Sequence, residues 1–151
     1  MKKTLIIIGC TVITLVVLIG AIALYAMRST TDYSATAAPY IRNAITQIST
    51  WDTHTTKQLL AADTLAKTQD ENLAQLLKWF EKLGSLRSIE EPVLTNLSSN
   101  YSLTGSKQVT STYNVITHYE HGEAQITLQL IEVDGGFAVQ QFHLSSPALI
   151  D

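Results

Sequence analysis

The sequence has a single cysteine, Cys10, and none in the residues that follow it. One thiol cannot form an intramolecular disulfide, so packing alone must stabilise the folded part of the chain. The sequence also lacks the GxSxG, HExxH, CxxC and Walker motifs that mark common hydrolases, metalloproteases, redox proteins and nucleotide-binding proteins. No catalytic set emerges, which favours a protein that is not an enzyme.

Basic residues are few and form no stripe. Lys2 and Lys3 are the only charged residues before Arg28, so the part from residue 28 onward has a formal charge of −5, against −3 for the whole chain. A domain of this sign does not attract polyanions. We therefore expect no nucleic-acid partner.

Charge is absent altogether from residues 4–27, which lie between Lys3 and Arg28. A helix of this length rises about 35 Å, which is enough to cross a bilayer core of about 30 Å. The pattern predicts a transmembrane anchor over residues 1–28, in contact with the membrane through residues 4–27.

Three other interpretations of this segment are less favoured. Ala21-Ile22-Ala23 has the form of a signal-peptide cleavage site, but the apolar run is longer than that of a cleaved signal. Ile7-Ile8-Gly9-Cys10 is similar to a bacterial lipobox, yet the chain stays apolar after Cys10. A pilin-like leader would have glutamate where this chain has Thr14.

Basic residues before the apolar segment indicate its orientation. Lys2 and Lys3 favour a cytoplasmic N-terminus. The Met-Lys-Lys-Thr start is typical of bacterial proteins. We expect a single-pass protein of the bacterial inner (cytoplasmic) membrane, with its C-terminal domain in the periplasm or outside the cell.

Residues 29–38 are small and polar, and we interpret them as a tether. Residues 39–151 are sufficient for one domain. Pro39 can open a helix at its first position, and Ile41, Ile45 and Ile48 would form its apolar face.

Two more helices are expected. One covers about residues 53–66. The other begins at a capping box, Thr68-Gln69-Asp70-Glu71, and ends at Gly84. Its apolar stripe is Leu73, Leu76, Leu77, Phe80 and Leu83.

Beyond Gly84 the apolar period changes to two residues, which indicates strands. We expect a strand over residues 86–97 with an edge or bulge at Pro92, a loop over 98–107, and three further strands that turn at His121-Gly122 and Gly135-Gly136. The predicted fold class is α+β: three helices packed on one face of a four-stranded antiparallel meander.

Alternation also predicts a register. A two-residue turn at His121-Gly122 pairs Tyr119 with Ala124, Thr117 with Ile126, Val115 with Leu128 and Tyr113 with Leu130. This register opposes Glu120 and Glu123, which is unfavourable. In the last hairpin Glu132 opposes Val139, and a β-bulge at Gln140-Gln141 is needed to turn Phe142 and Leu144 inward, opposite Leu130 and Leu128.

Three segments are similar to small bacterial domains of the cystatin-like and nuclear-transport-factor-2-like superfold. They are the Ile-rich helix leading into Trp51-Asp52, Leu83-Gly84-Ser85-Leu86, and Gly136 to Ser145. The resemblance covers roughly residues 38–146. It implies one of several roles: many such domains are membrane- or lipid-anchored with no known activity, others assemble secretion or conjugation machines in the inner membrane, and some form ligand pockets or are isomerases or dehydratases. Fold similarity alone is weak support for any one of these.

Few side chains suggest chemistry. His118, Glu120, His121 and Glu123 could form a surface metal site, but a polar hairpin tip is the favoured interpretation, and no metal or cofactor is assigned. Tyr113, Thr117 and Tyr119 point to the helix side in the predicted register. Asp52 could approach from the helix layer, so these four residues are the candidate ligand-binding set. Asp52 is nevertheless better interpreted as a helix N-cap, and the tyrosines as rim residues of the core.

Two classes of function follow. The leading hypothesis is a membrane-anchored module for protein association, with another protein or a second copy. The alternative is a small-ligand-binding domain or isomerase-type enzyme with a pocket between helices and sheet.

Overall fold

The structure is a computed structural model that describes residues 19, 21–22, 34–101, 103 and 105–150. It divides into two compact units, residues 1–35 and 36–151. The predicted span of residues 4–27 lies almost wholly outside the described residues. Among the residues described, no helix is long and apolar enough to cross a membrane.

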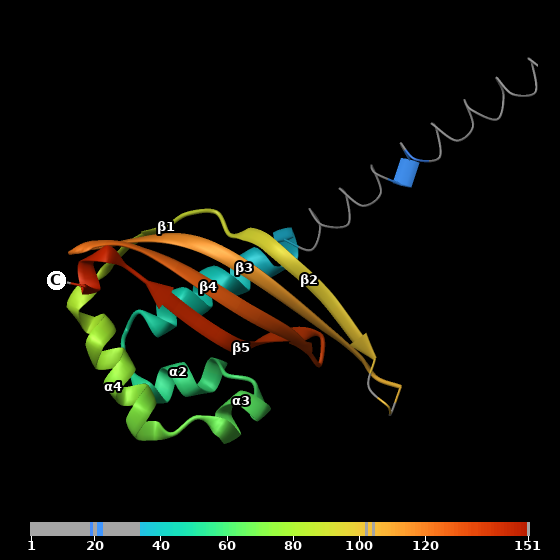
Figure 1. Ribbon diagram of the computed structural model, residues 1–151, viewed down its shortest axis with the longest axis horizontal. Coiled ribbons are helices and arrows are strands. Elements are labelled where there is room, and N and C mark those ends of the chain that lie inside the picture. The colour runs from blue at the N-terminus through green and yellow to red at the C-terminus, as the bar shows by residue number, and fades with distance from the viewer. Residues whose placement is uncertain (1–18, 20, 23–33, 102, 104, 151) are drawn as a thin grey trace, which may run out of the picture. The chain divides into compact units, whose positions relative to one another are not determined.

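The larger unit is an α+β fold, as predicted (Figure 1). A helix over residues 34–48 comes first. It is followed by α2 (Thr53–Leu59), α3 (Ala62–Lys67), α4 (Asp70–Phe80), η1 (Glu81–Leu83), β1 (Leu86–Ile89), β2 (Val93–Tyr101), β3 (Lys107–Tyr119), β4 (Gly122–Val133), β5 (Gly136–Ser145) and η2 (Pro147–Leu149). The strand order is β1-β3-β4-β5, and β2 also pairs with β3.

The first helix buries the predicted face, since Ile41 and Ile45 are fully buried and Ile48 is 1% exposed. It does not begin at Pro39, however, because residues 34–38 of the expected tether are already helical. Alanine favours helix in this stretch, and buried Ala37 extends the apolar face toward the N-terminus. Pro39 is exposed, has no N–H to donate to the Ala35 carbonyl, and its ring crowds that carbonyl, so it weakens the helix at this point.

The helix expected over residues 53–66 is two helices, α2 and α3. At Leu60 the chain makes a parallel bridge to Val139, and the Ala61 amide donates to the Val139 carbonyl at 2.8 Å. These β-type contacts with the edge of β5 interrupt the helical hydrogen bonds. The helices are thereby tied to the sheet at the point where they separate.

The capping box expected at Thr68 is wrong. Helix α4 begins at Asp70 after Gln69, and the Thr68 hydroxyl donates back to the Thr64 carbonyl at 2.7 Å. The apolar stripe is confirmed at its C-terminal end, where Leu77, Phe80 and Leu83 are buried. Gly84 follows with φ of 77°, a conformation that suits glycine, and ends the helical segment as predicted.

The sheet has five strands rather than four. The expected strand over residues 86–97 is divided at residues 90–92 into β1 and β2, and both pair with β3. The expected loop over residues 98–107 is wrong, because β2 continues to Tyr101 and pairs there with Lys107. Ser98, Ser99 and Asn100 lie on β2, an edge strand where polar side chains reach solvent.

The β3–β4 hairpin turns at Glu120-His121, one residue earlier than the predicted turn at His121-Gly122, so each residue of β3 pairs two positions earlier in β4 than predicted. Tyr119 pairs with Gly122, Thr117 with Ala124, Val115 with Ile126 and Tyr113 with Leu128. A shift of two residues keeps the same side chains on the inner face, so the predicted core is retained. The observed register sets Glu123 opposite His118 and so avoids the Glu120–Glu123 opposition.

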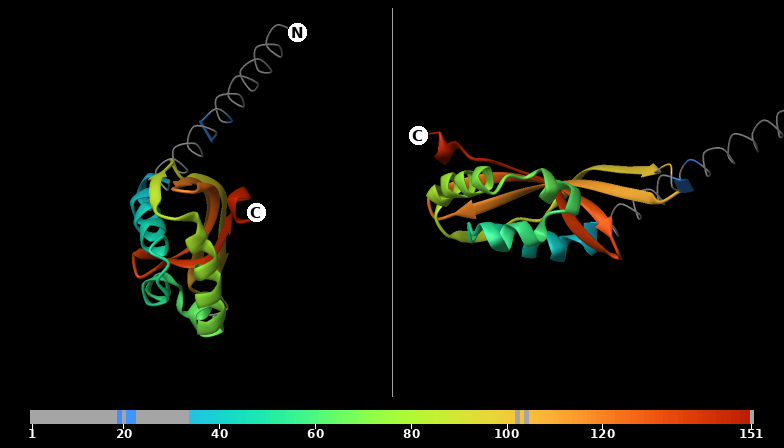
Figure 2. Two further views of the ribbon diagram at one scale, coloured as in Figure 1. Left: turned by 90° about the vertical axis from the view of Figure 1, so that its left-hand side faces the viewer. Right: turned by 90° about the horizontal axis from the view of Figure 1, so that it is seen from below.

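The predicted bulge in the last strand is confirmed. Gln129 pairs with Gln141 and Leu130 with Val139, which leaves Gln140 as the extra residue in β5. The partners in β4 are shifted by two residues from the predicted ones. Phe142 lies opposite Leu128 rather than Leu130, and Leu144 lies opposite Ile126 rather than Leu128. Figure 2 shows the sheet and the helices from two further sides.

Candidate functional site

An apolar cavity of about 290 Å³ lies between the helices and β5. Its lining before α3 consists of Ile48 from the first helix, Thr56 from α2 and Leu60, which follows α2. Thr64 comes from α3 and Thr68 follows it. Helix α4 contributes Asn72, Leu73, Leu76 and Leu77, and β5 contributes Gln140, Gln141 and Phe142. Four helical segments and one strand therefore converge on one hollow, close to the position where the sequence predicts a pocket.

A second hollow of about 340 Å³ adjoins the first. It is lined by Asp63, Thr64, Lys67, Thr68, Gln129, Gln140 and Gln141. Four of these residues, Thr64, Thr68, Gln140 and Gln141, line both hollows. The two hollows are therefore neighbouring compartments, an apolar one toward α4 and a polar one toward α3 and β4.

The β-bulge explains why two consecutive glutamines line both compartments. In a regular strand, neighbouring side chains point to opposite faces of the sheet. A bulge inserts an extra residue and re-aims the side chains beside it. The Thr64 hydroxyl donates to the Gln140 carbonyl at 2.8 Å, which fixes α3 against this irregular backbone.

The hydroxyl protons of the cavity threonines are already used. The hydroxyls of Thr56, Thr64 and Thr68 donate to backbone carbonyls at 2.7 to 2.8 Å. Their oxygens keep acceptor capacity. Among the residues described in the lining of the apolar cavity none is titratable.

The candidate ligand residue Asp52 caps α2. Its carboxylate accepts from the Thr55 amide at 2.8 Å and from the Thr55 hydroxyl at 2.7 Å. These hydrogen bonds lower the pKa of the exposed Asp52 carboxyl. The expected N-cap role is confirmed, and Asp52 lines neither compartment.

The candidate residues on the sheet lie on its buried inner face. The Thr117 hydroxyl donates to the Ala124 carbonyl at 3.0 Å, and the Tyr119 hydroxyl lies 2.9 Å from the Ser49 hydroxyl. Tyr113 is fully buried, and its hydroxyl has no hydrogen-bond partner among the described residues. Burial raises the pKa of Tyr113 and of Tyr119. None of these three residues lines either compartment.

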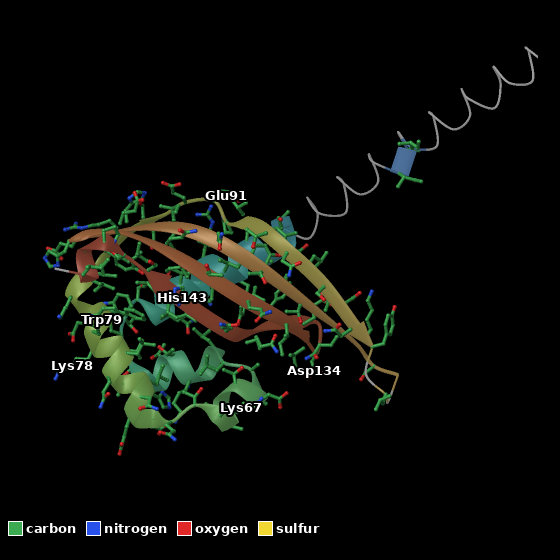
Figure 3. All side chains as sticks on the ribbon, in the orientation of Figure 1. Lys67, Lys78, Trp79, Glu91, Asp134 and His143 are labelled. Carbon is green, nitrogen blue, oxygen red and sulfur yellow. The ribbon has the colours of Figure 1, made fainter. Side chains whose placement is uncertain are left out.

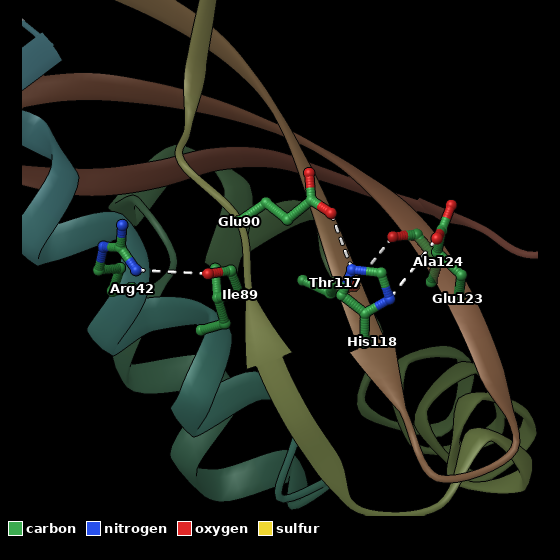
Figure 4. A network of polar contacts seen from close by, with 7 residues as sticks. All are labelled: Arg42, Ile89, Glu90, Thr117, His118, Glu123 and Ala124. Carbon is green, nitrogen blue, oxygen red and sulfur yellow. Dashed lines mark hydrogen bonds and ion pairs between the residues drawn. The ribbon is translucent and has the colours of Figure 1, made fainter.

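The polar cluster at the β3–β4 hairpin is divided among several partners. His118 Nε2 lies 2.8 Å from Glu90, and its Nδ1 lies 3.5 Å from Glu123 (Figure 4). Glu120 faces Arg87 instead, at 3.7 Å, and His121 Nδ1 lies 3.0 Å from the Lys82 carbonyl. No group of three or more potential metal ligands occurs within the part of the chain that the structure describes.

Sequence reasoning predicted a pocket between the helices and the sheet, but none of its four candidate residues lines this cavity. One available signal was the spacing of Thr56, Leu60, Thr64 and Thr68, each four residues after the previous one. Another was the glutamine pair at the predicted bulge. Both signals combine local periodicity with a tertiary contact, the approach of α3 to β5, that the sequence did not reveal.

No protein-family model and no curated protein matches the chain. Among solved structures, the chain is similar to ActVI-ORFA from Streptomyces coelicolor, with 14% sequence identity and a TM-score of 0.41. The similarity covers 78% of this chain and 96% of that one. A similarity this low assigns neither a fold family nor an activity, so the superfold resemblance stays a prediction.

Proposed function

We propose that the domain of residues 36–151 binds a small, largely apolar molecule in the cavity between α2–α4 and β5. The observation that carries this proposal is the lining of that cavity, in which six leucine, isoleucine and phenylalanine side chains lie beside six side chains with a hydroxyl or amide group. Such a combination is typical of ligand sites. The volume of about 290 Å³ is near the lower limit for small-molecule pockets, which is roughly 300 Å³.

An isomerase-type activity has less support than binding. Such chemistry needs a positioned base and a hydrogen-bond donor that stabilises the developing charge. The apolar cavity has donors and acceptors but no titratable side chain among its described lining residues, and Asp63 and Lys67 line only the adjoining polar compartment. Binding without chemical conversion is therefore the proposed role.

We further propose that residues 4–27 anchor the protein in the bacterial inner membrane, with the binding domain in the periplasm or outside the cell. The support is the uncharged run, which is long enough to span the bilayer core, together with the lysines before it. The domain would then meet ligands that leave or enter the membrane.

The two tryptophans allow a direct test of the binding role. Trp51 and Trp79 each lie against Phe80, with ring centroids 6.1 and 5.6 Å apart, and Phe80 contacts the cavity residue Phe142 at 6.2 Å. A brominated alkane in the cavity should therefore quench their fluorescence. Titration of the full chain in lipid nanodiscs with 1-bromododecane should give saturable quenching.

Leu73→Gln provides the decisive variant, with Leu65→Gln as its matched control. Leu73 lines the cavity, whereas Leu65 is 38% exposed on α3 and lines neither compartment. Placing an amide in the apolar lining should weaken binding by about tenfold or more, because a polar group then loses water without gaining a partner. Quenching that is unsaturable, or that is identical in both variants, would refute the binding proposal.

A second candidate function is self-association through strand β2, which the exposed side chains of this strand favour. Val93, Leu97 and Tyr101 are 59%, 45% and 74% exposed, and the segment of residues 93–101 has no charged residue. In the described structure β2 pairs only with β3. An uncharged strand with one free edge can pair with the same strand of a second copy. We propose a second copy as the partner at this edge.

A further inference from the structure

We infer that the ligand is a single-chain amphiphile, whose tail lies in the apolar compartment and whose polar head, without net charge, lies in the adjoining polar compartment. This inference rests on the binding role proposed above and specifies the class of ligand. It depends on the sharing of Thr64, Thr68, Gln140 and Gln141 by two compartments of opposite character.

The two compartments differ in the residues that they do not share. Only the apolar compartment has Ile48, Leu60 and the leucines of α4, together with Phe142. Only the polar compartment has Asp63, Lys67 and Gln129. A purely apolar ligand would leave the polar hollow to water, and a purely polar ligand would lose solvation in the apolar one. A molecule with a distinct head and tail satisfies both.

The shared residues form a polar boundary at which head and tail would join. Their side chains are two hydroxyls and two amides, so an ester or amide carbonyl can accept a hydrogen bond at this boundary, and the N–H of an amide linkage can donate one. The threonine hydroxyl protons are used by backbone carbonyls, so the glutamine amides are the available donors at this boundary. The bulge at Gln140 brings both glutamines to it.

The charges of the polar compartment favour a ligand head group without net charge. The polar compartment has one cation, Lys67, and one anion, Asp63, so its formal charges cancel. Gln129 and the shared residues add neutral donors and acceptors. An anionic head would meet Asp63 and a cationic head would meet Lys67, whereas a hydroxyl-rich head can hydrogen-bond to both.

The test compares three probes with the same brominated tail: bromododecanoyl glycerol, bromododecanoate and 1-bromododecane. Each is titrated into the full chain in nanodiscs, with tryptophan quenching as the readout. We expect the glycerol ester to bind about tenfold more tightly than the alkane, because its head forms additional hydrogen bonds. Shortening the ester to bromodecanoyl glycerol should weaken binding by about fourfold per methylene removed.

Lys67→Met and Lys78→Met form a matched pair of variants. Figure 3 shows Lys67 on α3 and Lys78 on the outer side of α4. Only Lys67 lines the polar compartment. Lys67→Met should remove the advantage of the ester over the alkane, while Lys78→Met should leave both affinities unchanged.

The outcomes separate this inference from the binding proposal. If the alkane binds as tightly as the ester while Leu73→Gln weakens both, the cavity binds ligands but the amphiphile inference is overturned. Tighter binding of bromododecanoate than of the ester would overturn the neutral head. Absence of saturable binding for every probe would refute the binding proposal itself.

Discussion

At the scale of single residues, the buried hydroxyls of β3 differ in how they are satisfied. Thr117 has a carbonyl partner, whereas the Tyr113 and Ser111 hydroxyls are buried without a hydrogen bond among the described residues. A buried hydroxyl without a partner costs free energy on folding, and one with a partner contributes. Strand β3 thus allows a buried hydroxyl with a hydrogen-bond partner to be compared with one that has none.

Tyr113→Phe should leave the free energy of unfolding unchanged or raise it by about 1 kcal/mol, because it removes an unsatisfied group. Thr117→Val keeps the side-chain shape, removes the bond to the Ala124 carbonyl, and should lower that free energy by about 1 kcal/mol. Urea denaturation followed by tryptophan fluorescence measures both. A loss for Tyr113→Phe as large as that for Thr117→Val would show that the tyrosine hydroxyl has a partner, such as a buried water.

Asp52 gives a prediction with a pH dependence. Its folded-state pKa is lowered by the hydrogen bonds from Thr55, so its contribution to stability is fully present above the unfolded pKa of about 3.9. That contribution is lost as the pH falls through the folded-state pKa. At neutral pH, Asp52→Ala should lower the melting temperature by a few degrees, while Asp52→Asn should retain it because asparagine caps equally well.

The measurement is a series of thermal melts from neutral pH to about pH 3. The difference in melting temperature between the native chain and Asp52→Ala should become smaller as the pH falls. The difference between Asp52→Asn and Asp52→Ala should stay constant, since neither side chain titrates. A gap between native and alanine chains that does not change with pH would contradict the capping role of the ionised carboxylate.

At the scale of elements, the bulge in β5 connects the sheet to the site. Deletion of one of the two glutamines should leave a regular strand, because Val139 and Gln141 already pair with the consecutive residues Leu130 and Gln129. The inner face would then keep its register. We expect the deletion variant to fold, to lose about 1 kcal/mol of stability with the bond from Thr64, and to bind the glycerol ester less tightly.

Deletion of Thr127 is the control for this variant. It lies within β4, between two strands, so its removal shifts the register and turns the buried side chains on one side of it outward. Circular dichroism should therefore show a folded chain after the glutamine deletion and an unfolded one after the Thr127 deletion. Unfolding of both variants would mean that the bulge is required for the fold and not only for the site.

The edge of β2 gives a second prediction at this scale. A lysine at the centre of a free strand edge opposes pairing with a second copy, since the two charges would approach each other. Leu97→Lys should therefore abolish a crosslinked dimer of the full chain in membranes, whereas Lys107→Arg, at the start of β3, should not. A dimer that persists in Leu97→Lys would place self-association elsewhere on the chain.

Local patterns predicted most of the elements but not their long-range pairing. The apolar faces of the first helix and of α4, the hairpin strands and the bulge all follow from periodicity, which depends on neighbouring residues. The break at Leu60 does not follow from periodicity, because its partner in β5 is distant in the sequence. The start of α4 does not follow either, because the Thr68 hydroxyl donates to the Thr64 carbonyl instead of capping the helix. The cavity lining was missed for the same reason, since it combines α3 with the far end of the chain.

At the scale of the whole molecule, the folded unit depends on packing without any disulfide. Aromatic contacts contribute to its core. The Trp51 ring centroid lies 5.6 Å from that of Tyr119 and 6.1 Å from that of Phe80, and the Trp51 backbone is in the left-handed region with φ of 58°. Its indole N–H also donates to the Gly84 carbonyl at 3.4 Å. These contacts tie the corner before α2 to the sheet, and all of them lie within residues 36–151.

The last prediction separates anchoring from folding. A chain that begins at residue 34 keeps the first helix as described, residues 34–48, both tryptophans and every lining residue of the two compartments. It should melt at the same temperature as the full chain and bind 1-bromododecane with similar affinity. After cell fractionation, the full chain should sediment with membranes and resist extraction by high salt, whereas the shortened chain should not sediment. Recovery of the full chain in the soluble fraction would refute the anchor, because salt does not weaken the burial of an uncharged segment in lipid.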